Sequence, residues 1–225
     1  MTKRVLCQHC QRPKNACVCA FITPIKNDIH VVVLQHPSEV SHAKGTIPLL
    51  AKSLSSCQII VGEDFTNNEQ LQQILSNYQA LLLYPSENSK ELCALTDDLF
   101  QHSGFKEVHE NTHCKVKAKP YCLIILDGTW KKAYKMFMLC QMLKQLPQVC
   151  LPESLANAGQ YHIRTVAKKN ALSSLEACCY ALTLLEDNKK YQKLITKFIE
   201  FNQFQLSFRP KHHLSTQQVN SLGKN

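Results

Sequence analysis

The sequence of 225 residues lacks the long apolar runs of a membrane protein. No run approaches the roughly 20 residues that a membrane-spanning helix requires. The first residues also lack the apolar stretch of a signal peptide, and cysteines begin already at position 7. An internal repeat is missing too, which argues against a repeat architecture. We therefore expect a cytoplasmic protein that does not contact a membrane.

Acidic residues are scarce relative to basic ones. The chain has 17 Asp+Glu against 26 Lys+Arg, which gives a formal net charge of +9 at pH 7. Such an excess of positive charge suits a polyanionic partner such as a nucleic acid. Charge alone does not name the partner, because an ordinary basic soluble protein has the same balance.

The twelve cysteines do not follow the pattern of a secreted disulfide scaffold. Eight of them are scattered through apolar segments, for example at Cys122, Cys140, Cys178 and Cys179. Thiols in such positions are typical of buried small side chains in a reducing compartment.

The remaining four cysteines lie within 13 residues near the N-terminus. They are Cys7, Cys10, Cys17 and Cys19. Two close pairs joined by a six-residue loop predict a tetrahedral zinc site in a small knuckle. Residues 1–26 are too few to bury a core, so metal binding would supply their folding free energy. Four sulfur ligands leave no open position, which indicates a structural metal. His9 is an alternative ligand, disfavoured because it is adjacent to Cys10.

Residues 27–186 alternate between strand-like and helix-like segments. The strand candidates are short, apolar and rich in β-branched residues or leucine, and they cover 29–34, 58–61, 80–84, 121–126 and 148–151. The helix candidates cover 47–54, 69–78, 130–143 and 175–185, with a further helix from residue 190. This alternation predicts an α/β fold with a mostly parallel sheet and helices on both faces.

Three predictions concern boundaries and loops. Capping boxes are expected at two helix starts, where Thr66 precedes Glu69 and Ser173 precedes Glu176 by three residues. The polar, unusually long connection at 104–120 is typical of a functional loop. The predicted domains are a zinc-binding module at 1–26, an α/β catalytic domain at 27–208 and a basic, flexible tail at 209–225.

The tetrapeptide Asp127-Gly128-Thr129-Trp130 lies between the strongest apolar run and an amphipathic helix. Gly128 permits a tight turn, and Thr129 suits a helix N-cap. Asp127 ends a strand, which is where open α/β sheets bind ligands. Trp130 is the only tryptophan, and a core position and stacking on a flat ring are both compatible with its place at a helix start.

This tetrapeptide resembles the Asp-x-Thr-Trp motif of the DTW-domain family. Three further motifs occur in the order that the family uses: Cys7-x2-Cys10-x6-Cys17-x-Cys19, then His36-Pro37-Ser38-Glu39, and Arg164 followed by Leu172-Ser173-Ser174-Leu175-Glu176-Ala177. The segment Leu81-Leu82-Leu83-Tyr84-Pro85 is similar as well. The resemblance covers about residues 5–186, and the chain departs from the family pattern at Ala167, often a proline, and at Ser174, often a threonine.

The family consists of tRNA-uridine 3-(3-amino-3-carboxypropyl)transferases related to SPOUT enzymes. The resemblance therefore implies a SPOUT-like fold with a C-terminal knot, S-adenosylmethionine as co-substrate and tRNA as partner. The donor-site residues that it implies are Leu83, Tyr84, Pro85, Gly128, Thr129, Trp130, Arg164, Leu172, Ser173, Ser174 and Glu176. The residues expected at the RNA are His36, Glu39, Lys44, Thr46, Lys131, Lys132, Lys168 and Lys169.

Asp127 is the candidate catalytic base for the family reaction. Uracil N3–H is a weak acid, so a base must remove the proton as the new bond forms. The alternative is that Asp127 holds a loop by hydrogen bonds. His36 and Glu39 likewise are either an acid/base pair or partners that hold their loop. Arg164 suits the donor carboxylate, an RNA phosphate or a surface ion pair.

Two other functions remain compatible with the sequence. A SPOUT-type RNA methyltransferase uses the same donor but presents a different carbon. A non-catalytic zinc-knuckle RNA-binding protein would bind RNA without the donor. No segment indicates an obligate protein partner.

Overall fold

The computed structural model describes residues 5–42, 45–93, 119–156 and 172–208. Within these ranges, one sheet of six strands has the order β2-β1-β5-β3-β6-β4, and every pairing is parallel. The predicted α/β class with a parallel sheet is confirmed. Among the described residues, none of the helices is long and apolar enough to cross a membrane.

All five predicted strands are present, with ends shifted by one residue. The strands are β1 (His30–Gln35), β2 (Cys57–Val61), β3 (Gln79–Leu83), β4 (Lys90–Glu91), β5 (Tyr121–Asp127) and β6 (Gln148–Cys150). The two-residue strand β4 was not predicted, because Lys90 and Glu91 are exposed and carry no apolar pattern.

The helices follow the predicted segments, with several short additions. The α-helices are α1 (Pro37–Val40), α2 (Ile47–Ser53), α3 (Glu69–Asn77), α5 (Trp130–Leu139), α6 (Gln141–Gln145), α7 (Glu153–Ala156), α8 (Ser174–Leu185) and α9 (Gln192–Ser207). Short 3-10 turns are η1 (Lys14–Ala16), η2 (Cys19–Phe21) and η3 (Lys189–Tyr191).

Two details of the helix predictions were wrong. The segment 130–143 is not one helix, because Cys140 has an extended backbone that separates α5 from α6. The capping box of Thr66 with Glu69 does not form, since Asn68 caps α3 and accepts the Leu71 N–H instead. Asn68 is the residue directly before the first residue of α3, two positions closer than Thr66, and asparagine is a favoured N-cap residue.

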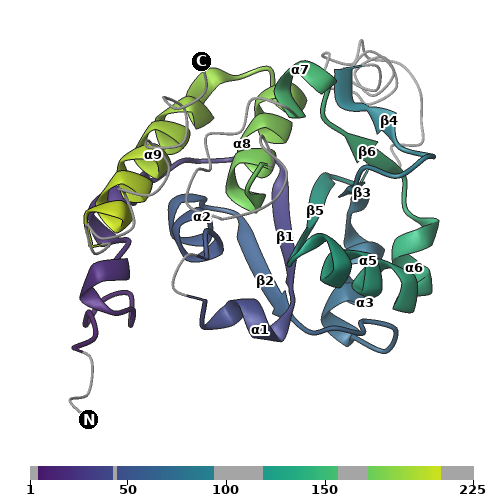
Figure 1. Cartoon of the computed structure of the whole chain (residues 1–225). Helices are drawn as coiled ribbons and strands as arrows, with labels where there is room; N and C mark the ends of the chain where they lie inside the picture. Colours follow the sequence, from purple (N-terminus) through teal and green to yellow (C-terminus); the bar gives the residue numbers. More distant parts are fainter. Residues whose placement is uncertain (1–4, 43–44, 94–118, 157–171, 209–225) are drawn as a thin grey trace, which may run out of the picture.

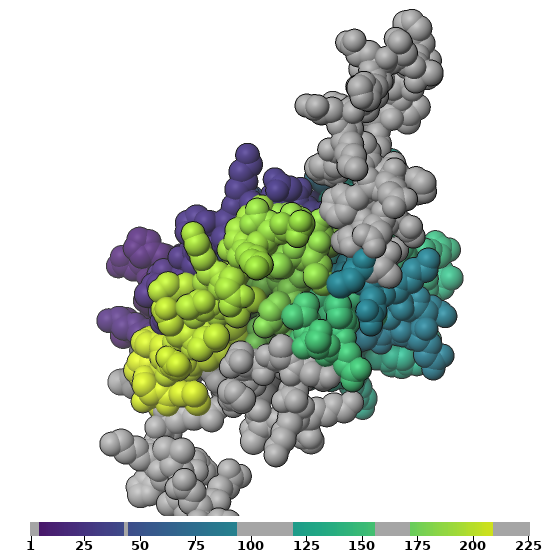
Figure 2. All heavy atoms as spheres, turned by 90° about the horizontal axis from the view of Figure 1, so that it is seen from above, coloured from purple at the N-terminus to yellow at the C-terminus, as the bar shows by residue number. Residues whose placement is uncertain are grey.

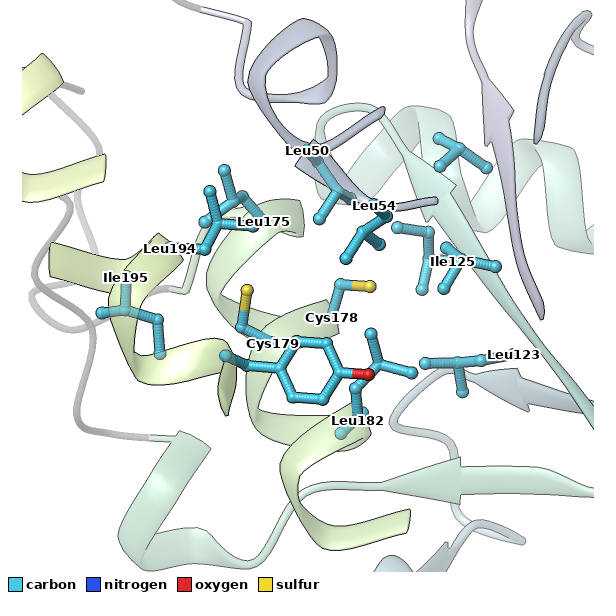
Figure 3. Packing of buried hydrophobic residues seen from close by; sticks show 14 of the residues in the cluster. Leu50, Leu54, Leu123, Ile125, Leu175, Cys178, Cys179, Leu182, Leu194 and Ile195 are labelled. Carbon is cyan, nitrogen blue, oxygen red and sulfur yellow. The ribbon is translucent and has the colours of Figure 1, made fainter. Parts of the chain in front are cut away.

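Helices cover both faces of the sheet (Figure 1). Successive strand residues point to opposite faces, so Val31 and Val33 join one core while Val32 and Leu34 join the other. The first core contains α2, α8 and α9, and Figure 3 shows Leu50, Leu123, Cys178 and Leu182 packed within it. The second core contains side chains of α3, α5 and α6.

The N-terminal residues pack against α9 rather than standing apart. Phe21 contacts Phe201 and Phe204, with ring centroids 5.4 and 5.5 Å apart. Val18 is fully buried in the same core as α8 and α9. Figure 2 shows α8 and α9 side by side next to the N-terminal residues. The boundary at residue 26 stays a prediction.

Parallel pairing places the carboxyl ends of β1, β5 and β3 at one edge of the sheet, with Gln35 in register with Asp127. The loops that follow these strands therefore meet there. The C-terminal edge is the part of the sheet that positions the candidate site.

Candidate functional site

Asp127 is a buried carboxylate held by two donors from distant parts of the chain. Its Oδ2 accepts a hydrogen bond from Gln35 Nε2 at 2.9 Å, and its Oδ1 accepts one from Ser174 Oγ at 2.6 Å. Asp127 is only 6% exposed. Both oxygens thus have fixed directions, and the group sits where β1, β5 and the start of α8 converge.

The start of α8 is fixed by a complete capping box, as predicted. Ser173 Oγ accepts the Glu176 N–H at 3.2 Å, while a Glu176 carboxylate oxygen accepts the Ser173 N–H at 2.8 Å. Glu176 is fully buried. Because Ser173 makes the cap, the hydroxyl of the next residue, Ser174, is available to reach Asp127.

The turn after Asp127 requires a small residue for close packing. Gly128 does not have a positive φ. A Cβ at this position would lie 3.1 Å from Lys132 Cβ and 3.6 Å from His36 Cβ. Thr129 is the N-cap of α5, as predicted, and its hydroxyl faces the Lys132 N–H at 3.4 Å. Trp130 is 59% exposed, which excludes the core position.

His36 caps α1 and binds Glu63, so it does not pair with Glu39. Its Nδ1 accepts the Ser38 N–H at 3.2 Å, which requires this nitrogen to be unprotonated. Its Nε2 lies 3.0 Å from Glu63 Oε1 and is therefore the donor. The sequence left open whether His36 and Glu39 form an acid/base pair or hold one another in the loop, and the structure shows neither contact between their side chains, because His36 faces Glu63 and Glu39 faces Lys132.

The lysines of α5 differ in their surroundings. Lys132 Nζ lies 2.9 Å from the buried Glu39 and also contacts Ser38. Lys135 Nζ lies 2.9 Å from Glu63, and the pKa of that carboxyl is lowered by hydrogen bonds from Lys135 and His36. Lys131 is exposed, and within the described ranges no acidic group pairs with it. Positive charge at the start of α5 is thus partly neutralised.

Tyr84 directly follows β3, and its ring lies against Phe137 of α5. The rings of Tyr84 and Phe137 are stacked with centroids 4.7 Å apart. Burial raises the pKa of the Tyr84 phenol, and the nearby Tyr134 adds to this effect. Leu83, Tyr84 and Leu172 are half-buried.

The structure places only one of the remaining predicted RNA-binding residues, Thr46. Thr46 is 5% exposed and its carbonyl accepts two N–H groups of α2. Lys44, Arg164, Lys168 and Lys169 lie outside the described residues, as does most of the connection at 104–120. The RNA roles assigned to these positions stay predictions.

The four N-terminal cysteines converge on one point. Their sulfur atoms all lie within 4.8 Å of one another. The Cys7–Cys19 and Cys10–Cys17 sulfur distances are both 3.7 Å. A tetrahedral zinc ion with Zn–S bonds of about 2.3 Å places its sulfur ligands about 3.8 Å apart. The donor set therefore has the chemistry and the size of a metal site.

Backbone turns build this cluster. The Cys7 N–H donates to the Arg12 carbonyl at 2.8 Å and the Gln11 N–H to the Cys7 carbonyl at 2.9 Å. Gln11 has a φ of 57°, in the left-handed region that such a turn requires. Hydrogen bonds from the Cys10 and His9 backbone lower the pKa of Cys7 to about 6. Burial raises the pKa of Cys19 to about 12.

Two functional candidates escaped the sequence interpretation. Gln35 carries no signal by itself, since it is one polar residue at the end of an apolar strand. Its role follows only from the pairing of β1 with β5, which sets it opposite Asp127. Glu63 lies in a loop and becomes visible only through its contacts with His36 and Lys135.

Comparisons with known proteins agree on one family. The model of the DTW domain matches residues 4–206. A Drosophila melanogaster protein named tRNA-uridine aminocarboxypropyltransferase 2 is 30% identical over 202 residues, covering 87% of this chain and 72% of its own. The Macaca fascicularis protein of the same name is 28% identical, covering 96% and 69%. An Arabidopsis thaliana protein, tRNA-uridine aminocarboxypropyltransferase A, is 25% identical, covering 92% and 83%. No solved structure gave a significant match.

Proposed function

Because this chain belongs to the DTW domain family, we propose that it transfers the 3-amino-3-carboxypropyl group of S-adenosylmethionine to N3 of a uridine in tRNA. The observation that carries the proposal is the buried Asp127 carboxylate, fixed between Gln35 and Ser174 at the C-terminal edge of the sheet. A proton acceptor in a defined direction is what the weakly acidic uracil N3–H needs.

The residues at this edge fit the donor. The donor supplies a sulfonium-activated carbon and leaves as methylthioadenosine, so no metal or redox group is required for the transfer. Backbone N–H groups at the start of the twelve-residue helix α8 attract the donor's carboxylate. The half-buried Tyr84 and the Phe137 ring against it offer an apolar wall for adenine. Gly128, Thr129 and Arg164 complete the proposed donor site.

Ser174 links Asp127 to the substrate. Its hydroxyl proton already points to Asp127 Oδ1, and the residue is half-buried, so its oxygen lone pairs are available. In the proposed step, the N3 proton passes to Ser174 Oγ while the Ser174 proton passes to Asp127. N3 loses its proton at the same time as it bonds to the donor carbon, so no free uracil anion accumulates. The bond between that carbon and sulfur breaks, and its electron pair stays on sulfur. Gln35 keeps the carboxylate in place throughout.

The four cysteines would hold a structural zinc ion. Their number and their sulfur distances support this role. Four sulfur ligands leave no position for a reacting group, so the ion would stabilise the turns that carry Val18 and Phe21 into the core.

We also propose the SPOUT-like knot for this family member. The start of α8 would belong to the knotted turn, which would explain why its cap is buried beside Asp127. Segments 94–118 and 157–171 lie outside the described residues, so the path of the chain through the knot stays a prediction. The cytoplasmic location stays one as well.

Analysis of the donor product tests the reaction. The protein is incubated with tRNA and S-adenosylmethionine, and the adenosine products are separated by chromatography. We expect methylthioadenosine, formed only when tRNA is present. S-adenosylhomocysteine would instead establish the methyltransferase alternative. Binding of RNA with neither product would establish the non-catalytic alternative.

A further inference from the structure

We propose that the outward side of α5 is a stacking surface for unpaired nucleotides of the RNA substrate. We call it the α5 outer face and define it by Trp130, Tyr134, Met138, Lys131 and Lys135. The inference rests on the proposed function only for the identity of the RNA as tRNA. The stacking and phosphate contacts themselves would suit any single-stranded nucleic acid.

Helix geometry separates this face from the core. Ala133 and Met136 are buried, and Met136 packs in the core beneath the sheet. Trp130, Tyr134 and Met138 follow one another at intervals of four residues, so they form one row on the other side. They are 59%, 57% and 44% exposed.

The exposure is concentrated rather than scattered. Among the described residues, eleven large hydrophobic side chains are exposed, and four of them belong to α5. Single exposed apolar side chains are normal, whereas a contiguous row indicates an interaction site. The two aromatic rings at the N-terminal end are the part that a flat ligand can use.

The charge of α5 favours RNA as the occupant. The helix contains three lysines and no acidic residue. Lys131 and Lys135 lie beside the aromatic row, and the Lys135–Glu63 pair joins two half-exposed side chains, so a phosphate can compete for this lysine. Aromatic rings next to lysines are the combination by which proteins bind single strands, through base stacking and phosphate contacts.

The α5 outer face is continuous with the candidate site. Trp130 is the last residue of the tetrapeptide that begins with Asp127, and Tyr134 lies close enough to Tyr84 to raise the pKa of its phenol. A uridine whose N3 reaches Ser174 must leave its base stack. The α5 outer face would then receive its unpaired neighbours and hold the strand in that conformation.

Tryptophan fluorescence provides the test, because Trp130 is the only tryptophan in the chain. We expect a short oligouridylate to quench this fluorescence and an RNA duplex of equal charge to quench it much less. Tyr134→Ala should weaken oligouridylate binding by about 5- to 150-fold, the value of one stacked base. Tyr134→Phe, which keeps the ring, should bind as wild type does. Phe208→Ala, which removes an equally exposed ring at the end of α9, serves as the matched control.

Three results would overturn the inference: no quenching by oligouridylate, equal quenching by the duplex, or unchanged affinity of Tyr134→Ala. Because binding is measured without the donor, these results are separate from the transfer reaction. Transfer without quenching would leave the proposed function intact and remove the stacking surface. Quenching without transfer would support the stacking surface and contradict the proposed function.

Discussion

The cysteine cluster and the Asp127 site differ in how the chain builds them. The four cysteines come from 13 consecutive residues, and turns between neighbours bring their sulfur atoms together. Asp127 instead meets Gln35 and Ser174, which lie 92 and 47 residues away in the sequence. The first site depends on local geometry and the second on strand register and helix placement.

The two sites also differ in whether the protein itself supplies partners for the charged groups. Both oxygens of Asp127 have donors within the protein, so this site is ordered by the fold itself. The sulfur atoms of the cysteines face one another at 3.7 Å, and only a cation can make that arrangement favourable for more than one thiolate. We therefore propose that the sheet edge carries the chemistry and that the cluster depends on a metal to fold.

Removal of a cysteine should have the largest effect. We expect Cys10→Ser to lose the metal, because structural zinc sites contribute roughly 10–16 kcal/mol of apparent binding free energy that a missing ligand greatly reduces. Elemental analysis should give about one zinc ion per wild-type chain and far less in the variant. Hydrogen exchange should report loss of protection in residues 5–25 and little change in β5.

Cys150→Ser is the matched control, since Cys150 is also half-buried but lies in β6. It should retain the metal. Wild-type protein that contains no metal when purified under reducing conditions would contradict the assignment. The cluster should take no part in the chemical step. If Cys10→Ser abolished transfer at saturating substrate while β5 stayed protected from exchange, the two sites would not be independent.

Substitution of Asp127 should have the next largest effect. Asp127→Asn keeps the shape and can keep a hydrogen bond to Ser174, but it removes the proton acceptor. We expect transfer to fall by roughly 10²–10⁴-fold, with donor and tRNA affinity largely retained. Single-turnover kinetics beside separate binding measurements provide the test. Near-normal turnover in the folded variant would show that Asp127 only shapes the loop.

The difference between the sites also explains what the sequence could predict. The cysteine spacing, the apolar strands and the capping box of Ser173 are local patterns, and the structure has all of them. The partners of Asp127 and His36 were missed because Gln35 and Glu63 become meaningful only through tertiary contacts. The short strand β4 escaped because pairing with β6, rather than its own composition, makes it a strand.

Removal of Gln35 should have an intermediate effect. Gln35→Leu removes a buried hydrogen bond to the Asp127 carboxylate, a contact worth about 1.5–3 kcal/mol when the acceptor is charged. We expect the transfer rate to fall by roughly 10- to 100-fold, a range that corresponds to this energy. The same substitution at Gln58, in the neighbouring strand β2, should have little effect on the rate. Equal losses at both positions would indicate a general effect on the sheet.

The two neighbouring lysines should have the smallest and most distinct effects. Lys131→Ala should leave thermal stability unchanged. It should make the slope of log affinity for tRNA against log salt concentration shallower by the amount expected for about one phosphate contact. Lys132→Ala should instead lower the melting temperature, because the buried Glu39 carboxylate loses its ion pair with Lys132. Calorimetry and binding at several salt concentrations separate the two. A reversed pattern would mean that Lys132 faces the RNA and Lys131 does not.

The central claim is that the edge around Asp127 modifies uridine in tRNA, and mass spectrometry of nucleosides tests it most directly. Unmodified tRNA is incubated with the protein and S-adenosylmethionine, digested to nucleosides and compared with the same reaction containing Asp127→Asn. The account predicts 3-(3-amino-3-carboxypropyl)uridine with the wild-type protein and little of it with the variant. A methylated uridine, or no change in any nucleoside with active donor and intact tRNA, would contradict it.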